Sequence, residues 1–152
     1  MVREIQILFA TETGTVELVA DEVVEAYRSS AHVHFEAVRM DHTQPTIFHS
    51  GGVYLLITSS TGKGELPRNA RAFCSALQAL STPLKQVRYG ILGYGDRFYA
   101  STFGGGPRTL DQLMQHAGAT RIGELAQHDR QSGTYAEEFA LNWLQKWVTQ
   151  LE

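Results

Sequence analysis

The alternation of two kinds of apolar segment constrains the fold of this chain more than any other feature of its sequence. Short apolar runs, too brief for a stable isolated helix, alternate with longer stretches whose apolar residues recur at helical spacing. The short runs lie at residues 5–10, 32–38, 53–57, 87–92 and 121–126. Such alternation predicts a doubly wound α/β fold, in which a five-stranded parallel sheet carries helices on both faces.

The spacing of apolar residues also distinguishes the expected elements from one another. Residues 53–57 are apolar throughout, as in a central parallel strand, whereas residues 32–38 alternate as in a half-buried or edge strand. Amphipathic helices are expected in residues 18–27, 70–80, 110–117 and 135–151. The connection over residues 41–50 is expected to be irregular or a single helical turn.

The size and charge of the chain favour one globular domain over residues 1–152. Its 152 residues leave too little sequence for a second core, and a hydrophobic fraction of 43% is too high for a disordered chain. The formal charge of −3 comes from 13 basic and 16 acidic residues and does not indicate binding to nucleic acid or to an anionic membrane. We therefore expect neither partner.

The single cysteine, Cys74, excludes a disulfide framework, a cysteine-ligated iron–sulfur cluster and a cysteine-rich zinc site. It lies on the apolar stripe of an expected helix, so we interpret it as a packing residue. The six histidines lack the spacing of common metal motifs, and no metal site is expected. No apolar run is long enough to cross a membrane, and the N-terminus does not look like an export signal. These features favour a reducing, cytoplasmic location.

The carboxyl ends of the expected strands are where a ligand site is expected, because open doubly wound sheets bind their ligands there. The first loop runs from Thr11 to Thr15 and leads into a helix N-terminus, whose unpaired backbone amides favour a phosphate. It contains no lysine or arginine and matches neither the nucleoside triphosphate loop nor the dinucleotide fingerprint. A metal-free monophosphate site fits this loop, and so does a threonine-capped helix without a ligand.

Two further loops follow two expected strands that neighbour each other. The second loop, residues 58–65, reads TSSTGKGE, and the third loop, residues 93–99, reads GYGDRFY. Glycines spaced along both loops let backbone amides line a slot, and tyrosine offers a face for stacking. A planar heteroaromatic ring fits such a slot.

Motifs in the three loops resemble the flavin mononucleotide (FMN) loops of flavodoxins. They are TETGT at 11–15, STGKGELP at 60–67 followed by Asn69, and G-x-G-x-x-x-Y at 93–99. The chain is most similar to short-chain flavodoxins of the MioC type and to the flavodoxin-like domains of diflavin reductases, and the likeness covers essentially all of it. It implies a flavodoxin-like sheet with strand order 2-1-3-4-5 and a noncovalently bound FMN.

The resemblance also implies a set of FMN-binding residues. The 5′-phosphate would be held by Thr11, Glu12, Thr13, Gly14, Thr15 and Val16. The inner edge of the isoalloxazine ring would be lined by Ser59, Ser60, Thr61, Gly62 and Gly64. The outer edge would be lined by Tyr94, Gly95, Asp96 and a stacked Tyr99, with Phe103 and Asp129 as further contacts. In flavodoxins a carbonyl of the second loop turns toward flavin N5 on reduction, and Gly62 suits such a turn because glycine tolerates positive φ.

The chain departs from the flavodoxin pattern in two ways. Thr61 stands where cytochrome P450 reductase has tyrosine and many flavodoxins have tryptophan, so a stacking contact worth about 0.5–1.5 kcal/mol is missing. Many flavodoxins surround the flavin with carboxylates, whereas Lys63, Arg97 and Arg130 stand beside the acidic residues here. We therefore expect a less negative second reduction potential and a shallower salt dependence of partner docking than in acidic flavodoxins.

The predicted function is that of a one-electron carrier between a separate NADPH-dependent flavoprotein reductase and an unidentified acceptor enzyme. The sequence thus favours an electron-transfer flavoprotein over a stand-alone enzyme. Two alternatives stay open: an FMN-dependent NAD(P)H:quinone-type reductase, for which the sequence shows no second fingerprint, and a ligand-free binding module. A receiver-like signalling domain is disfavoured, because Thr11, Ser59 and Ser60 stand where its acidic residues and phosphoacceptor aspartate belong.

Overall fold

The parallel sheet has the strand order that the sequence predicts. The computed structural model describes residues 2–61, 63–97 and 103–151. Its strands are β1 (Arg3–Ala10), β2 (Val33–Arg39), β3 (Gly52–Ser59), β4 (Val87–Gly95), β5 (Thr120–Arg121) and β6 (Ala126–Asp129). They pair in parallel in the order β2-β1-β3-β4-β5, with β6 also paired to β4. This arrangement confirms the predicted flavodoxin-like topology.

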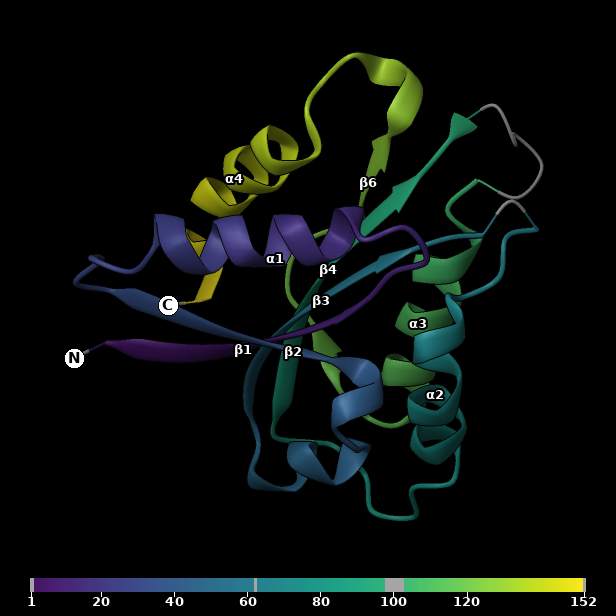
Figure 1. The fold of residues 1–152 in the computed structure, drawn as a ribbon. Helices are drawn as coiled ribbons and strands as arrows, with labels where there is room; N and C mark the ends of the chain where they lie inside the picture. Colours follow the sequence, from purple (N-terminus) through teal and green to yellow (C-terminus); the bar gives the residue numbers. More distant parts are fainter. Residues whose placement is uncertain (1, 62, 98–102, 152) are drawn as a thin grey trace.

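Helices cover both faces of the sheet (Figure 1). One face carries α1 (Thr15–Ala26) and α4 (Ala136–Trp147), and the other carries α2 (Arg71–Gln78) and α3 (Gly105–His116). Successive residues of a strand point to opposite faces, so Ile7 packs under α1 and α4 while Leu8 packs under α2 and α3. Burial on both faces explains why the central strands are apolar throughout.

The expected fifth strand over residues 121–126 is wrong in its bounds. That segment divides into β5 and β6; the amide of Ile122 still donates to Tyr89 O of β4 at 2.7 Å, and the chain leaves the sheet after it. Trp147 Nε1 donates to the carbonyl of Ile122 at 3.0 Å, and Gly123 turns the chain with a φ of 75°. The same indole lies against Gly90 of β4, where a Cβ would be 2.5 Å from the ring. The carbonyl of Ile122 is thus bonded to α4, at the point where the chain turns out of the sheet.

Other bounds differ from the expectation at element ends. β4 continues to Gly95, so the first three residues of the expected third loop belong to a strand. The connection over 41–50 forms two 3-10 helices, Met40–His42 and Pro45–Ser50, and a third, Arg68–Ala70, precedes α2. Helix α4 ends at Trp147 and continues as a 3-10 turn to Leu151. Among the described residues, no helix is long and apolar enough to cross a membrane.

Candidate functional site

A cleft of about 820 Å³ lies at the carboxyl ends of β1, β3, β4 and β6. Residues predicted from all three loops line it: Glu12, Thr13, Thr15, Ser59, Ser60, Thr61, Tyr94, Gly95, Asp96 and Phe103. Its lining also contains Arg130, which the sequence places among the charges near the flavin, and five residues without a predicted role: Gly104, His128, Thr134, Tyr135 and Ala136. The parallel sheet brings these distant segments to one edge, as expected for a doubly wound fold.

The first loop ends at a helix start that suits an anion. Gly14 is the N-cap of α1 with a φ of 90°, and its amide donates to Thr11 Oγ1 at 3.0 Å. No side chain among the described residues caps the first turn, which leaves its backbone amides available to a ligand. Thr13 Oγ1 and Thr15 Oγ1 lie 3.4 Å apart at this end of the cleft. Hydroxyls and amides there are the donors that a phosphate group needs.

Residues that follow the second loop fix the position of the first loop. Asn69 Oδ1 accepts from the amide of Thr11, and Asn69 Nδ2 donates to the carbonyl of Thr11, each at 3.2 Å. Glu12 Oε1 accepts from the amide of Arg68 at 2.9 Å. The sequence motif includes Asn69 but predicts no role for it, and the structure shows that role. Its amide ties the two loops together.

Helix α3 begins flush against the second loop. A Cβ on Gly105 would lie 2.4 Å from Gly64 O, and a Cβ on Gly106 would lie 2.7 Å from Ser59 O. The amide of Gly106 also donates to Ser60 Oγ at 2.9 Å. Only glycine permits so close an approach of two backbones. The glycines that begin α3 therefore let the helix pack closely against the second loop.

Tyr94 is a buried residue of β4 and presents little of its ring to solvent. Its side chain is 4% exposed, and its hydroxyl donates to the carbonyl of Ala136 at 2.7 Å. Burial, followed by the negative charge of Glu137, raises the pKa of Tyr94 above its ordinary value. At pH 7 this residue is a neutral wall of the cleft that also holds the start of α4.

The segment from His128 to Ala136 forms a fourth wall of the cleft. His128 is 7% exposed, and its Nε2 donates to the carbonyl of Thr134 at 2.7 Å, which folds the segment back on itself. Tyr135 is 72% exposed at the rim, although it is a large aromatic residue. This wall could have been predicted only from the sheet topology. Because β6 ends beside β4, the chain after β6 must lie near the third loop.

Asp129 is committed to contacts within the protein. Its Oδ1 accepts from the amides of Arg97 and Gln131 at 3.0 and 2.9 Å, and its Oδ2 lies 3.2 Å from Arg97 Nε. Burial by itself would raise the pKa of Asp129, but these amide bonds and the charge of Arg97 outweigh it, and the pKa lies below its ordinary value. The predicted contact of Asp129 with a flavin stays a prediction.

Not every predicted residue lines the cleft. Thr11, Gly14, Val16, Gly64 and Asp129 adjoin the lining residues without belonging to them, and the side chain of Val16 is buried in the core under α1. Gly62 and Tyr99 lie outside the described residues. The roles predicted for these two residues therefore stay predictions.

One polar atom of the cleft is buried without a partner. Ser59 Oγ has no hydrogen-bond partner among the described residues, although Ser59 lines the cleft. A buried hydroxyl in this state costs free energy unless a ligand satisfies it. A helix start with available backbone amides, a slot between glycine-containing loops and an unpartnered hydroxyl suit a phosphorylated planar ligand such as FMN.

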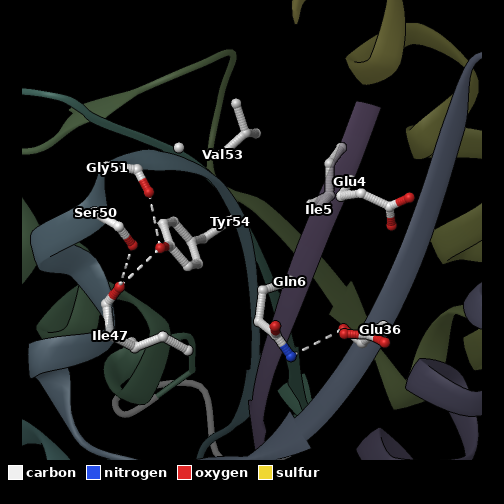
Figure 2. Close-up of a pocket in the computed structure, with 10 residues that line it drawn as sticks. Glu4, Ile5, Gln6, Glu36, Ile47, Ser50, Gly51, Val53 and Tyr54 are labelled. Atoms are coloured by element: carbon white, nitrogen blue, oxygen red, sulfur yellow. Dashed lines mark hydrogen bonds between the residues drawn. The ribbon is translucent and has the colours of Figure 1, made fainter. Parts of the chain in front are cut away.

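A smaller hollow lies at the opposite, amino end of the sheet. It has a volume of about 260 Å³ and contains none of the predicted site residues (Figure 2). Some of its polar groups bond to each other: Tyr54 Oη donates to the carbonyls of Ile47 and Gly51, and Gln6 Nε2 donates to the carbonyl of Glu36. The predicted site residues that the structure describes instead line or adjoin the carboxyl-end cleft.

Comparisons with known proteins agree on one family. The sequence profile of the flavodoxin family matches residues 7–143. Protein MioC of Escherichia coli is 28% identical over 149 residues, which cover 98% of this chain and 99% of MioC. A bifunctional cytochrome P450/NADPH–P450 reductase of Bacillus cereus is 33% identical over 133 residues, 87% of this chain but 12% of that protein. A flavodoxin variant from Pseudomonas aeruginosa has a TM-score of 0.85 at 23% identity and covers 97% of this chain and 98% of its own.

Proposed function

The chain belongs to the flavodoxin family of FMN electron carriers, and on that premise we propose that it binds FMN noncovalently in the carboxyl-end cleft and carries single electrons. The observation that supports this most is the convergence of the predicted loops on one cleft with a phosphate-binding helix start. FMN supplies the redox chemistry when bound, and the protein supplies position and electrostatics.

Each part of the cleft has a task in this proposal. The first-turn amides of α1 and the hydroxyls of Thr13 and Thr15 hold the phosphate. The second loop and the strand end at Gly95 would enclose the ring, and Ser59 Oγ would be available as a hydrogen-bond donor to it. The buried side chains of Tyr94 and His128 would exclude water behind the ring. Tyr135 stands at the rim, where a partner protein would approach.

Charges around the cleft influence the second reduction potential of the flavin. Glu12 and Asp96 line the cleft together with Arg130, while Arg97 and Asp129 pair with each other outside its lining. Negative charge opposes the second reduction step, so this mixed set gives a second potential less negative than that of a strongly acidic flavodoxin. One tenfold change in the equilibrium, about 1.4 kcal/mol, corresponds to about 59 mV for one electron.

We propose a separate NADPH-dependent flavoprotein reductase as the electron donor, an acceptor enzyme that stays unidentified, and a cytoplasmic location. The B. cereus relative is named for both a cytochrome P450 and an NADPH–P450 reductase, which supports this class of donor. The single cysteine, Cys74, leaves no disulfide framework in the given sequence, which supports a reducing compartment.

Titration of the purified protein with FMN tests the proposal directly. We expect saturable quenching of flavin fluorescence at one FMN per chain, and a flavin that NADPH alone does not reduce. Addition of a flavoprotein reductase together with NADPH then reduces it. Absence of quenching would show a ligand-free module, and rapid bleaching by NADPH alone would show the quinone-reductase alternative.

A further inference from the structure

Thr61 takes part in the second loop through its hydroxyl. Thr61 Oγ1 accepts hydrogen bonds from the amides of Lys63 and Glu65, each at 3.2 Å. The amide of Thr61 donates to Glu65 O, and its carbonyl accepts from the amide of Gly64, each at 2.9 Å. The residue that closes this turn also lines the cleft.

Both ends of the second loop are held from outside. At its start, the amide of Ser60 donates to Tyr94 O at 3.0 Å, and Ser60 Oγ accepts from Gly106 at 2.9 Å. Toward its end, Gly64 packs against Gly105, and Glu65 Oε2 lies 3.5 Å from Arg71 Nη2. Between these anchors, the Thr61 hydroxyl holds the loop from within.

We propose that the Thr61 hydroxyl is a positioning group that keeps the second loop in the shape that receives the flavin ring. This inference rests on the proposed FMN function. Threonine has no aromatic face, so it cannot stack on the ring as the tyrosine or tryptophan of related proteins does. It contributes instead by ordering the loop, because an ordered loop loses less conformational entropy when a ligand binds.

A valine and a serine at position 61 separate the hydroxyl from the rest of the side chain. T61V keeps the branched shape but removes the acceptor for two loop amides, whereas T61S keeps the acceptor. For T61V we expect the dissociation constant of FMN to rise about tenfold, equivalent to about 1.4 kcal/mol. For T61S we expect it to stay within about twofold of that of the unsubstituted protein.

Riboflavin and amide exchange supply readouts that a general loss of stability would not imitate. Riboflavin carries the ring without the phosphate, so T61V should weaken the binding of riboflavin as well as that of FMN. In ¹⁵N-labelled protein without flavin, the amides of Lys63 and Glu65 should exchange about tenfold faster in T61V than in T61S. T149V is the matched control. It removes a threonine hydroxyl that donates to Lys146 O at a distance of 2.6 Å, and Thr149 does not line the cleft.

The outcomes separate this inference from the proposed function. Unchanged FMN affinity in T61V, or an equal loss in T61V and T61S, overturns the positioning role and leaves FMN binding established. Unchanged exchange of the two amides overturns it as well. Failure of the unsubstituted protein to bind FMN refutes the proposed function and, with it, the premise of this inference.

Discussion

Replacing Gly105 by alanine would insert a methyl group between α3 and the second loop. The added Cβ would lie 2.4 Å from Gly64 O and 3.1 Å from Gly64 C and Cα. These are backbone atoms of a hydrogen-bonded turn, so no flexible side chain can move aside. Relief to an ordinary contact of about 3.5 Å requires the helix start and the loop to separate by about 1 Å.

Two effects of G105A follow from this displacement. Overpacking of this kind costs about 1–3 kcal/mol, which corresponds to a fall in Tm of about 2–12 °C for a domain of this size. The displaced loop is also a wall of the cleft, so the dissociation constant of FMN should rise about 10- to 100-fold, equivalent to about 1.4–2.8 kcal/mol. Thermal denaturation and fluorescence titration measure the two effects separately.

G90A is the matched control for G105A. A Cβ on Gly90 would lie 2.5 Å from the Trp147 indole, so this variant should lose stability to a similar extent. Neither Gly90 nor Trp147 lines the cleft, and the FMN affinity of folded G90A should be unchanged. Equal weakening of FMN binding in both variants, or full FMN affinity in G105A, would refute the reasoning that α3 packing positions the second loop.

Three further predictions concern single groups. S59A removes a buried hydroxyl without a partner, so it should stabilise the flavin-free protein by about 1 kcal/mol in denaturant titrations and yet weaken FMN binding. Folding lowers the pKa of Asp129, so its carboxylate stabilises the fold above about pH 4, and this contribution is lost as the pH falls through the folded pKa. In D129N the free energy of unfolding should therefore fall less steeply as the pH is lowered. Burial raises the pKa of Cys74 to about 11, so its thiol should resist alkylation at pH 8 until the protein is unfolded, and stability should fall as the pH rises from about 9 toward the folded value.

The fold was predictable from the sequence because its main signal is local. The apolar run at 53–57 and the alternation at 32–38 correctly indicated a central strand and an edge strand. The break between β5 and β6 was not predictable in the same way, because it depends on a bond from Trp147 to Ile122, 25 residues apart. Trp147 itself is a core residue of the expected C-terminal helix and is 1% exposed.

The candidate site was predictable where residues follow strand ends and not where they act through contacts across the fold. Motif order places Thr13 and Ser59 beside one another once the sheet is parallel. The wall formed by His128 and Tyr135 carries no motif, and its place follows only from the pairing of β6 with β4. Likewise, the sequence indicates that a helix begins at the glycines 104–106, but the packing of Gly105 against Gly64 depends on the tertiary structure.

Hydrogen bonds join the loops of the cleft to one another. Asn69, after the second loop, holds the backbone of Thr11 in the first loop, and Ser60 joins the start of the second loop to β4 and to α3. A shift of one loop is therefore passed to the others through bonds of about 3 Å. Substitutions in different loops share partners, so their effects on FMN affinity will not add. The phosphate and ring subsites are for this reason coupled, although the sequence presents them as separate motifs.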